Sequence, residues 1–287
     1  MREEPTTAHL AAEEPTQGSP TTTLSSSYAL LIGQWSPPAA LILLALAVWE
    51  GAVRLFHVQR WLLPPPSSIG AELIESRSLL LRHTWVTLEE VLLGFALALV
   101  VGIALATAIA YSRIVERAAY PFVIASQTVP IIAIAPLLLI WIGYGIWPKI
   151  IVVVLISFFP IVVNTVDGLK SADPDMLNMM RTLGASRWQL FTKVQAPSSV
   201  PFLFSGVRVA IAMSVIGAVI GEWVGASAGL GYLMTRSAPQ FLTDRVFASI
   251  FILSIMGITL FALVVLAERY ALPWYQWEKR DKATKRG

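Results

Sequence analysis

Residues 173–197 read DPDMLNMMRTLGASRWQLFTKVQAP, and this stretch decides how the rest of the chain is interpreted. Asp173 is a favourable N-cap residue for a helix that begins directly after it. Gly184 can adopt the positive φ with which many helices end. Ser186, followed three residues later by glutamine, predicts a capping box that starts a second helix, which we expect to end before Pro197. The stretch therefore predicts two short helices joined at a glycine.

The first of these helices has one apolar face. Its apolar side chains recur at the i, i+3, i+4 and i+7 spacing of an α-helix, and they are Met176, Met179, Met180 and Leu183. Arg181, Arg187 and Lys193 keep the segment out of hydrocarbon. Two water-exposed helices with an uncovered apolar stripe need another protein surface to cover it. We therefore interpret residues 172–197 as a hinge to which a partner docks.

The spacing of the hinge resembles the cytoplasmic EAA loop of ATP-binding-cassette (ABC) importer permeases. That loop has Glu-Ala-Ala, then a glycine, a hydrophobic residue ten positions after the glycine and a proline thirteen after it. The glycine and the later positions are held here by Gly184, Val194 and Pro197, and Ala185 and Phe191 also fit. The opening triplet departs from the pattern, since it is Asn178-Met179-Met180. The alternative is an ordinary amphipathic helix–glycine–helix connection between two membrane spans.

The composition is that of a polytopic, all-α membrane protein. Of the 287 residues, 56% are hydrophobic and only 14% are charged, with a mean hydropathy of +0.68. A soluble domain would carry about a quarter charged residues. Cysteine is absent and the three histidines are scattered, so we expect no disulfide and no metal site. The net charge of +3 is spread over loops and tails, which gives no reason to expect a nucleic-acid partner.

We expect six membrane-spanning helices, at about residues 39–56, 88–111, 119–141, 147–166, 205–225 and 246–267, because each run is close to the length needed to cross a bilayer. The domains follow from these runs. Residues 1–27 are interpreted as a disordered tail, 28–87 as the first span with an outer amphipathic segment at about 69–81, 88–267 as the core that contains the hinge, and 268–287 as a basic tail. Lys and Arg are more frequent on the segments that share a side with the hinge, which predicts that the hinge and both termini are cytosolic.

Polar residues within the spans indicate a path for a solute. The third expected span is interrupted by prolines around Gln127, Thr128 and Pro130, and broken helices survive in membranes where protein or water satisfies the freed backbone groups. In the fourth expected span, Ser157 and Asn164 share roughly one face. These side chains are candidates for the wall of a translocation pathway. The alternatives are an ordinary kinked packing helix and, for Asn164, a hydrogen bond between helices.

The fifth expected span ends in GEWVG, with a carboxylate that is costly in a membrane unless it is paired or hydrated. One interpretation places Glu222 and Trp223 at the outer mouth of the pathway, in contact with the solute or the gate. The other is that the carboxylate marks the membrane interface. Glycines at helical spacing, Gly206, Gly217, Gly221 and Gly225, make this span a candidate for the subunit interface or the central pathway.

The resemblance extends to about residues 60–267 through four runs, the third of which lies within the hinge: QTVPIIAIAPLLLIWIGYGIWPK, SFFPIVVNTVDGL, GASRWQLFTKVQAP and GEWVGASAGLGYLM. They are similar to permeases that import nitrate, taurine, alkanesulfonates, thiamine precursors or riboflavin, with the last two groups the most similar. The resemblance implies a homodimer, two cytosolic ATPase subunits docked at the hinge through Met176, Met179, Met180, Leu183, Gly184 and Ala185 with Arg181 and Arg187 at the rim, and an external binding protein.

The chain itself is not expected to be an enzyme. It has no G-x-x-x-x-G-K-[ST] run, so ATP and Mg²⁺ would be used by the partner ATPase and no cofactor is expected on this chain. No Ser/His/Asp or Cys/His arrangement suggests a catalytic residue. A stand-alone channel or secondary transporter is the competing class, but such transporters often show repeated halves, and no internal repeat is visible. The sequence thus predicts the permease subunit of a bacterial inner-membrane importer.

Overall fold

The computed structural model describes the backbone of residues 25–273 and the side chains of residues 37–273, and all regular elements in this part of the chain are helical. The chain divides into one unit that ends at Gly51 and another that starts at Ala52. Most of the expected tails, residues 1–24 and 274–287, lie outside the described part. Where the predicted tails overlap it, residues 25–27 begin helix α1 and residues 268–271 end helix α11, so both helices extend beyond the predicted limits.

Helix α1 (Ser25–Leu55) contains the first expected span. Its segment Pro37–Leu55 is long and apolar enough to cross a membrane, with a mean hydropathy of 1.7. The helix belongs mainly to the first unit, because the boundary between the units falls after Gly51. Two prolines lie inside it, yet the helix continues past them to the expected end near residue 56.

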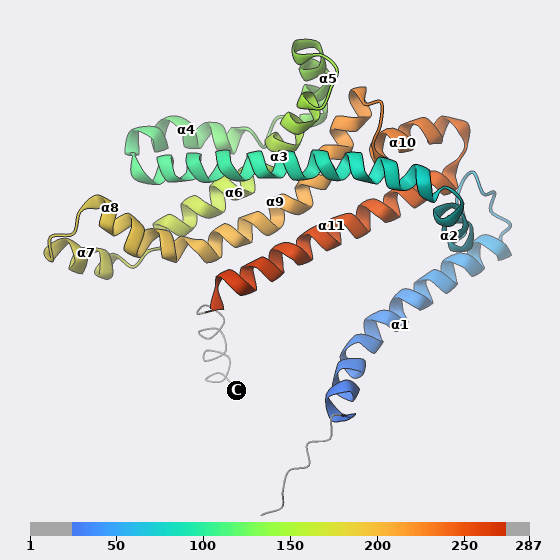
Figure 1. The fold of residues 1–287 in the computed structure, drawn as a ribbon, viewed down its shortest axis with the longest axis horizontal. Helices are drawn as coiled ribbons and strands as arrows, with labels where there is room; N and C mark the ends of the chain where they lie inside the picture. Colours follow the sequence, from blue (N-terminus) through green and yellow to red (C-terminus); the bar gives the residue numbers. More distant parts are fainter. Residues whose placement is uncertain (1–24, 274–287) are drawn as a thin grey trace, which may run out of the picture. The chain divides into compact units, whose positions relative to one another are not determined.

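Four long helices form the body of the second unit: α3 (Arg77–Tyr111), α6 (Trp147–Lys170), α9 (Ala196–Gly225) and α11 (Thr243–Ala271). They run side by side in Figure 1. Helix α6 packs most extensively against α9 and next against α3, while α11 packs on α9. Each of the four is long and apolar enough to cross a membrane. The unit is therefore built around the α6–α9 contact.

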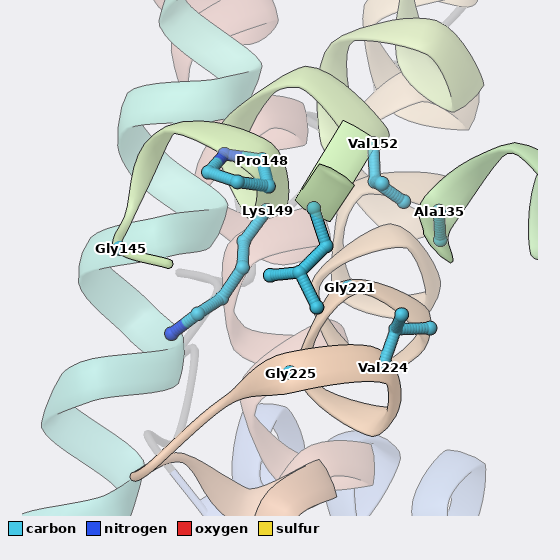
Figure 2. A pocket seen from close by; sticks show the side chains of 9 residues that line it. Ala135, Gly145, Pro148, Lys149, Val152, Gly221, Val224 and Gly225 are labelled. Atoms are coloured by element: carbon cyan, nitrogen blue, oxygen red, sulfur yellow. The ribbon is translucent and has the colours of Figure 1, made fainter. Parts of the chain in front are cut away.

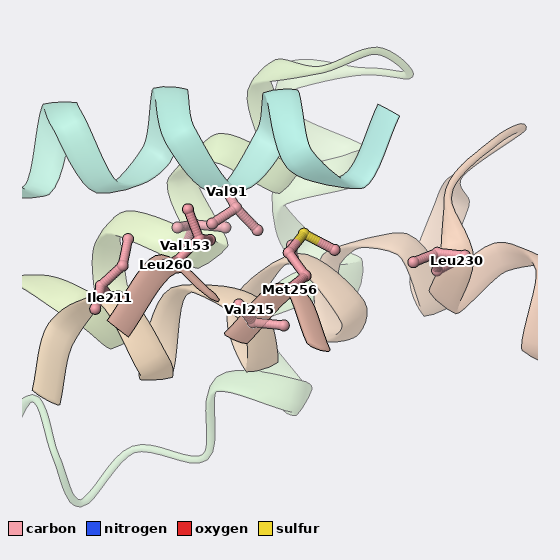
Figure 3. Close-up of a cluster of buried hydrophobic side chains, with 8 residues drawn as sticks. Val91, Val153, Ile211, Val215, Leu230, Met256 and Leu260 are labelled. Carbon is pink, nitrogen blue, oxygen red and sulfur yellow. The ribbon is translucent and has the colours of Figure 1, made fainter. Parts of the chain in front are cut away.

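One cluster of buried side chains joins these helices, as Figure 3 shows. It combines Val91 of α3 and Val153 of α6 with residues of α9, α10 (Leu230–Ser237) and α11, namely Ile211, Val215, Ala218, Leu230, Met256 and Leu260. In a bilayer, lipid tails are as apolar as these side chains, so close van der Waals packing rather than escape from water holds the helices together.

Glycines allow that close packing at the α6–α9 contact. A Cβ added at Gly206 would lie 2.5 Å from the carbonyl oxygen of Pro160, and one at Gly217 would lie 2.9 Å from the Cα of Val153. Gly221 faces Lys149 in the same way, and Gly225 faces Leu139. The glycine pattern of the fifth span is therefore used inside this chain. Helices of the same chain occupy the face that these glycines form, and a role of the fifth span at a subunit interface or in the central pathway stays a prediction.

The third expected span, 119–141, is not one helix. It consists of α4 (Arg113–Ala125) and α5 (Ile131–Ile142), separated by a turn at residues 126–130. Pro130 has no N–H with which to continue a helix, and the hydroxyls of Ser126 and Thr128 donate to the carbonyl oxygens of Val123 and Ala125. Among the described residues, five helices are long enough to span a membrane, and α5 is a shorter apolar helix. The third expected span is thus divided into two shorter helices.

The outer segment also differs from its prediction. Helix α2 (Pro66–Glu75) begins before the expected residue 69, and α3 begins at Arg77, about three helical turns before the expected 88. The start of α2 carries no side-chain cap, because Pro65 occupies the N-cap position. Instead α2 is fixed to α11, since Ser68 donates to Asp244 over 2.7 Å and Arg245 donates to Glu72 over 2.7 Å.

The glycine contacts lead to a stability prediction. We expect Gly206→Ala to destabilise the protein by about 1–3 kcal/mol, because the new methyl group would collide with a backbone oxygen that cannot move aside. Gly257→Ala in α11 is the matched control. Its Cβ would meet only a Val215 methyl group at 4.0 Å, so helix propensity makes this change neutral or stabilising. Thermal unfolding of the purified protein in detergent measures both. Equal midpoints for the two variants would contradict the account.

Candidate functional site

Three local features of the hinge agree with the sequence prediction: the cap of its first helix, the glycine that ends this helix and the capping box of the second helix. Helix α7 (Pro174–Thr182) is capped by Asp173, whose carboxylate accepts from the Asp175 N–H over 2.8 Å. Gly184 has φ +80, in the region that favours glycine, and it ends this helix. Helix α8 (Arg187–Leu190) starts with a complete capping box between Ser186 and Gln189. These three predictions are confirmed.

The second hinge helix does not end before Pro197. Helix α8 passes into a π-helical turn, Phe191–Gln195, which continues directly into α9. Pro197 lies in the first turn of α9, where a missing N–H is tolerated. The prediction of a separate second helix was therefore wrong. The whole stretch Arg187–Gly225 is one apolar helical segment, so the second half of the hinge is continuous with the fifth span.

The apolar face of the hinge is exposed. Met176 is 48% exposed, Met179 55% and Leu183 75%, while Met180 and Ala185 are partly covered. Trp188 adds to this surface with 66% exposure and stacks on Phe191 at 5.8 Å between ring centroids. Sequence reasoning missed Trp188, although its place in the first turn of a capped helix was a usable signal. We call these side chains, Met176, Met179, Leu183 and Trp188, the hinge surface.

Basic side chains lie beside the hinge surface. Arg181 and Arg187, both predicted as rim residues, line a cavity of about 750 Å³ together with Arg113 from the start of α4. The same end of the molecule is held by an ion pair between Lys170 and Glu116, 2.5 Å apart. The hydrogen bond and charge of Lys170 lower the pKa of the Glu116 carboxyl. The pair therefore contributes above the unfolded pKa of a glutamate and is lost only as the pH falls through the lowered value, so it persists at neutral pH.

The predicted pathway residues separate into two groups. Gln127 lines a cavity of about 210 Å³ between the α4–α5 turn, α6 and α9, with Pro160 and Met213 also on its wall. Thr128 and Pro130 are exposed in the same turn. Ser157 instead is buried and shares a 2.8 Å hydrogen bond with Ser214, and Asn164 donates to the carbonyl of Pro160. Of these five described residues, Gln127 is the one that lines this cavity.

Glu222 lies inside the fold rather than at an open mouth. Its side chain is 1% exposed and accepts hydrogen bonds from the Thr87 hydroxyl at 2.6 Å and from the N–H groups of Gly231 and Tyr232 at 2.5 and 3.2 Å. Its neighbour Trp223 is 45% exposed. Anionic groups are favourable at a helix N-terminus, so Glu222 stabilises the start of α10. A role for either residue in the pathway stays a prediction.

Two residues of α3 complete this cap. The Nδ1 atom of His83 accepts from the Gly229 N–H at 2.9 Å, and the Thr87 hydroxyl accepts from the Leu230 N–H at 2.8 Å. Together with Glu222, they satisfy four consecutive N–H groups at the start of α10, which have no partner within the helix itself. Sequence reasoning missed both. Their only signal is a polar pair four residues apart at the start of an apolar helix.

A charged pair lies near the same end of the molecule, away from the hinge. Lys149, in the first turn of α6, donates to Glu90 of α3, whose side chain is 1% exposed. Figure 2 shows Lys149 extending from α6 toward α3, past a nearly filled pocket of about 10 Å³ that Gly221 and Val224 also line. The pair also borders a larger cavity of about 550 Å³. In the described residues no three His, Asp or Glu side chains are placed to hold a metal ion.

Comparison with known proteins shows which family this chain is similar to. Residues 98–273 match the family described as the inner membrane component of binding-protein-dependent transport systems. The chain is 44% identical to the formylaminopyrimidine transport permease protein ThiX of Halalkalibacterium halodurans, over 83% of this chain and 95% of that one. It is 38% identical to the riboflavin transport system permease protein RibX of Chloroflexus aurantiacus, over 83% and 89%. A solved amino acid ABC transporter, crystallised with histidines, has the same fold, with a TM-score of 0.55 at 19% identity over 70% of this chain and 97% of that one.

The cap on α10 gives a second stability prediction. We expect Thr87→Val, which keeps the shape of the side chain, to destabilise the protein by about 1–3 kcal/mol, because it leaves both Oε1 of Glu222 and the Leu230 N–H without a partner. Thr84→Val is the control one turn earlier, where the hydroxyl only donates to the carbonyl of Leu80 within the same helix. Thermal unfolding compares them. A Thr87 variant as stable as the Thr84 variant would show that the cap is not needed.

Proposed function

The chain belongs to the inner membrane component family of binding-protein-dependent transport systems, the permeases of ABC importers, and from this we propose a specific role. The chain forms the translocation pathway for a flat nitrogen heterocycle, a thiamine-precursor pyrimidine or riboflavin. The names of two relatives support this choice, since one transports formylaminopyrimidine and the other riboflavin. The same machinery carrying taurine, an alkanesulfonate or nitrate is the alternative.

The observation that carries the proposal is the hinge. An apolar surface of two methionines, a leucine and a tryptophan is exposed next to a helix that continues without interruption into the membrane core. Exposed apolar patches of this kind mark interaction sites. A partner that grips the hinge surface would move α9 with it through α8, because the π-helical turn leaves no loop between α8 and α9. Helix α9 would in turn carry α6, its most extensive neighbour.

We assign the grip to two cytosolic ATP-binding subunits, which would consume ATP with Mg²⁺ on their own residues. Met176, Met179, Met180, Leu183, Gly184 and Ala185 would enter a groove on the ATPase, and Arg181 and Arg187 would face acidic groups at its rim. The exposure of the hinge surface supports this, and so does the cavity that gathers these two arginines with Arg113. The helices would then alternate between two arrangements, one that opens the translocation pathway to the outside of the membrane and one that opens it to the cytosol.

The rest of the assembly follows from the same proposal. A second copy of the chain would complete the pathway, a binding protein outside the cell would deliver the solute, and the hinge and both termini would face the cytosol of a bacterium from its inner membrane. The cavity at Gln127 between the α4–α5 turn and α9 supports a path along this face. A stand-alone channel would need no exposed hinge surface, which is why we do not favour it.

Uptake into proteoliposomes tests the proposed function directly. The permease, the ATPase and the binding protein are reconstituted together, and labelled hydroxymethylpyrimidine, riboflavin and taurine are supplied separately outside. We expect ATP-dependent uptake of a heterocycle and none of taurine. Uptake of taurine alone would replace the proposed substrate, and uptake of any solute without the ATPase would favour a channel.

The hinge glycine gives a prediction about coupling. Gly184→Val places a β-branched residue at φ +80, a strain of about 1–2 kcal/mol or more, although no atom within 4 Å would block it. We expect ATP-driven uptake to fall at least about tenfold while membrane insertion is retained. Gly184→Asn is the control, because asparagine tolerates this backbone region. Wild-type uptake by the valine variant would contradict a fixed hinge geometry.

The hinge surface gives a prediction about docking. Met179→Asp places a charge in the proposed apolar contact and should abolish co-purification of the ATPase. Asn178→Asp adds the same charge one residue away, beside Arg181, and should leave the ATPase bound. Pull-down of a tagged ATPase from mixed membranes reads out both. If the Met179 variant retains the ATPase, the partner contacts another surface.

A further inference from the structure

Two acidic side chains meet inside the fold, at the end of the molecule away from the hinge. Glu90 of α3 and Glu222 of α9 are each only 1% exposed. Thr87 lies three residues before Glu90, on the same face of α3, and its hydroxyl donates to Glu222 over 2.6 Å. The carboxyl groups of Glu90 and Glu222 are also hydrogen-bonded to each other. We call these two residues the carboxyl pair.

A hydrogen bond between two carboxyl groups requires a proton, because an ionised carboxylate only accepts and a protonated one also donates. Both oxygens of Glu222 already accept, Oε1 from a hydroxyl of α3 and Oε2 from two backbone N–H groups of α10. Oε1 of Glu90 accepts from Lys149. No described group donates to Oε2 of Glu90, although this atom is buried. The oxygen that lacks a donor is therefore the one that can carry the proton.

The charges around the carboxyl pair lead to the same assignment. Among the described residues, Lys149 of α6 is the cation that acts on both carboxyl groups. Helix α10 faces the pair with backbone N–H groups, and Nδ1 of His83 on α3 accepts from a further N–H before α10. Tyr144 lies on the wall of the cavity of about 550 Å³ that Glu90 and Lys149 also line. Two carboxylates and one ammonium would leave a net negative charge inside apolar helices, whereas one added proton makes the cluster neutral.

We infer that the carboxyl pair holds one proton, which is bound to Oε2 of Glu90 and donated to Glu222. With Lys149, the pair then forms a neutral contact that joins α3, α6 and α9 at the end away from the hinge. Loss of the proton would leave two adjacent carboxylates that repel each other, so an alkaline solution weakens the contact between α3 and α9. The inference goes beyond the proposed function and does not depend on which solute is carried.

A simple ion pair between Lys149 and Glu90 does not account for the same facts. It would leave Glu90 and Glu222 both ionised, and two carboxylates within hydrogen-bonding reach of each other do not both stay ionised in a buried site. It would also leave Oε2 of Glu90 buried without a donor, although buried polar atoms are normally hydrogen-bonded. One shared proton removes both difficulties.

The dependence of stability on pH tests the inference on the full-length chain in detergent. An exposed glutamate ionises near about pH 4.3, so the unfolded chain holds no proton on either residue at neutral pH, whereas the folded chain holds one. Stability is therefore lost as the pH rises, until the folded pair itself releases the proton. We expect this proton to raise the unfolding equilibrium constant about tenfold per pH unit between about pH 6 and 8. Comparison with a variant that lacks the proton isolates this contribution from those of the other titrating groups.

Glu90→Gln is that variant, because its amide keeps an oxygen for Lys149 and offers an N–H to Glu222 in place of the O–H. We expect it to be as stable as the wild type at about pH 6, to lack the tenfold dependence and to be about a hundredfold more favourably folded at about pH 8. Glu89→Gln, at the exposed neighbouring position, should keep the wild-type profile. A Glu90 variant that is less stable at every pH, with a profile parallel to the wild type, shows an ionised Glu90 and overturns the inference.

Infrared spectroscopy tests the wild type by itself. The C=O stretch of a protonated carboxyl is separate from the carboxylate bands, and exposed carboxyl groups are ionised at about pH 8. We expect the wild-type protein to show a protonated-carboxyl band at this pH and the Glu90→Gln protein to lack it. A wild-type spectrum without the band overturns the inference even if the variant does not fold. A band that persists in the folded variant places the proton elsewhere and overturns it as well.

Discussion

Unbroken helical structure between the hinge and the membrane is the constraint on which the other features depend. Helix α8 leads through a π-helical turn into α9, so a force on α8 reaches the fifth span without passing through a loop. A π-turn adds a residue to the helix and commonly marks functional positions. Here it keeps Arg187–Gly225 in one segment even though Pro197 and Pro201 lie within it.

The glycines hold α9 in close contact with α6. At Gly206 and Gly217 the backbone of α6 lies where a side chain would otherwise stand, so the two helices cannot separate without opening a void along their contact. Gly168 on α6 receives Ser199 and Phe202 of α9 in the same way. Packed helices of this kind have a few discrete arrangements rather than a continuous range. That property suits a protein that alternates between two states.

Much of the hinge could be predicted from sequence because its determinants are local. The Asp173 cap, the positive φ of Gly184 and the Ser186 capping box each depend on residues within three or four positions. The cap on α10 could not be predicted, because His83 and Thr87 lie more than 140 residues from the N–H groups that they accept. Pro197 led to a wrong prediction because a proline usually ends the helix that precedes it. Here Pro197 lies in the first turn of α9, and the π-helical turn joins α9 to α8.

The rigid connection between hinge and fifth span is tested most directly by distance measurement between two spin labels. The chain has no cysteine, so cysteines at Arg187 and Trp223 can be labelled alone, about 54 Å apart for 36 residues of helix. The labelled chain is diluted with unlabelled copies in the full transporter, with and without ATP. The account predicts one narrow distance distribution that is the same in both states. A shift of several ångströms, or broadening on binding ATP, would show that the helix bends at the π-turn and would contradict it.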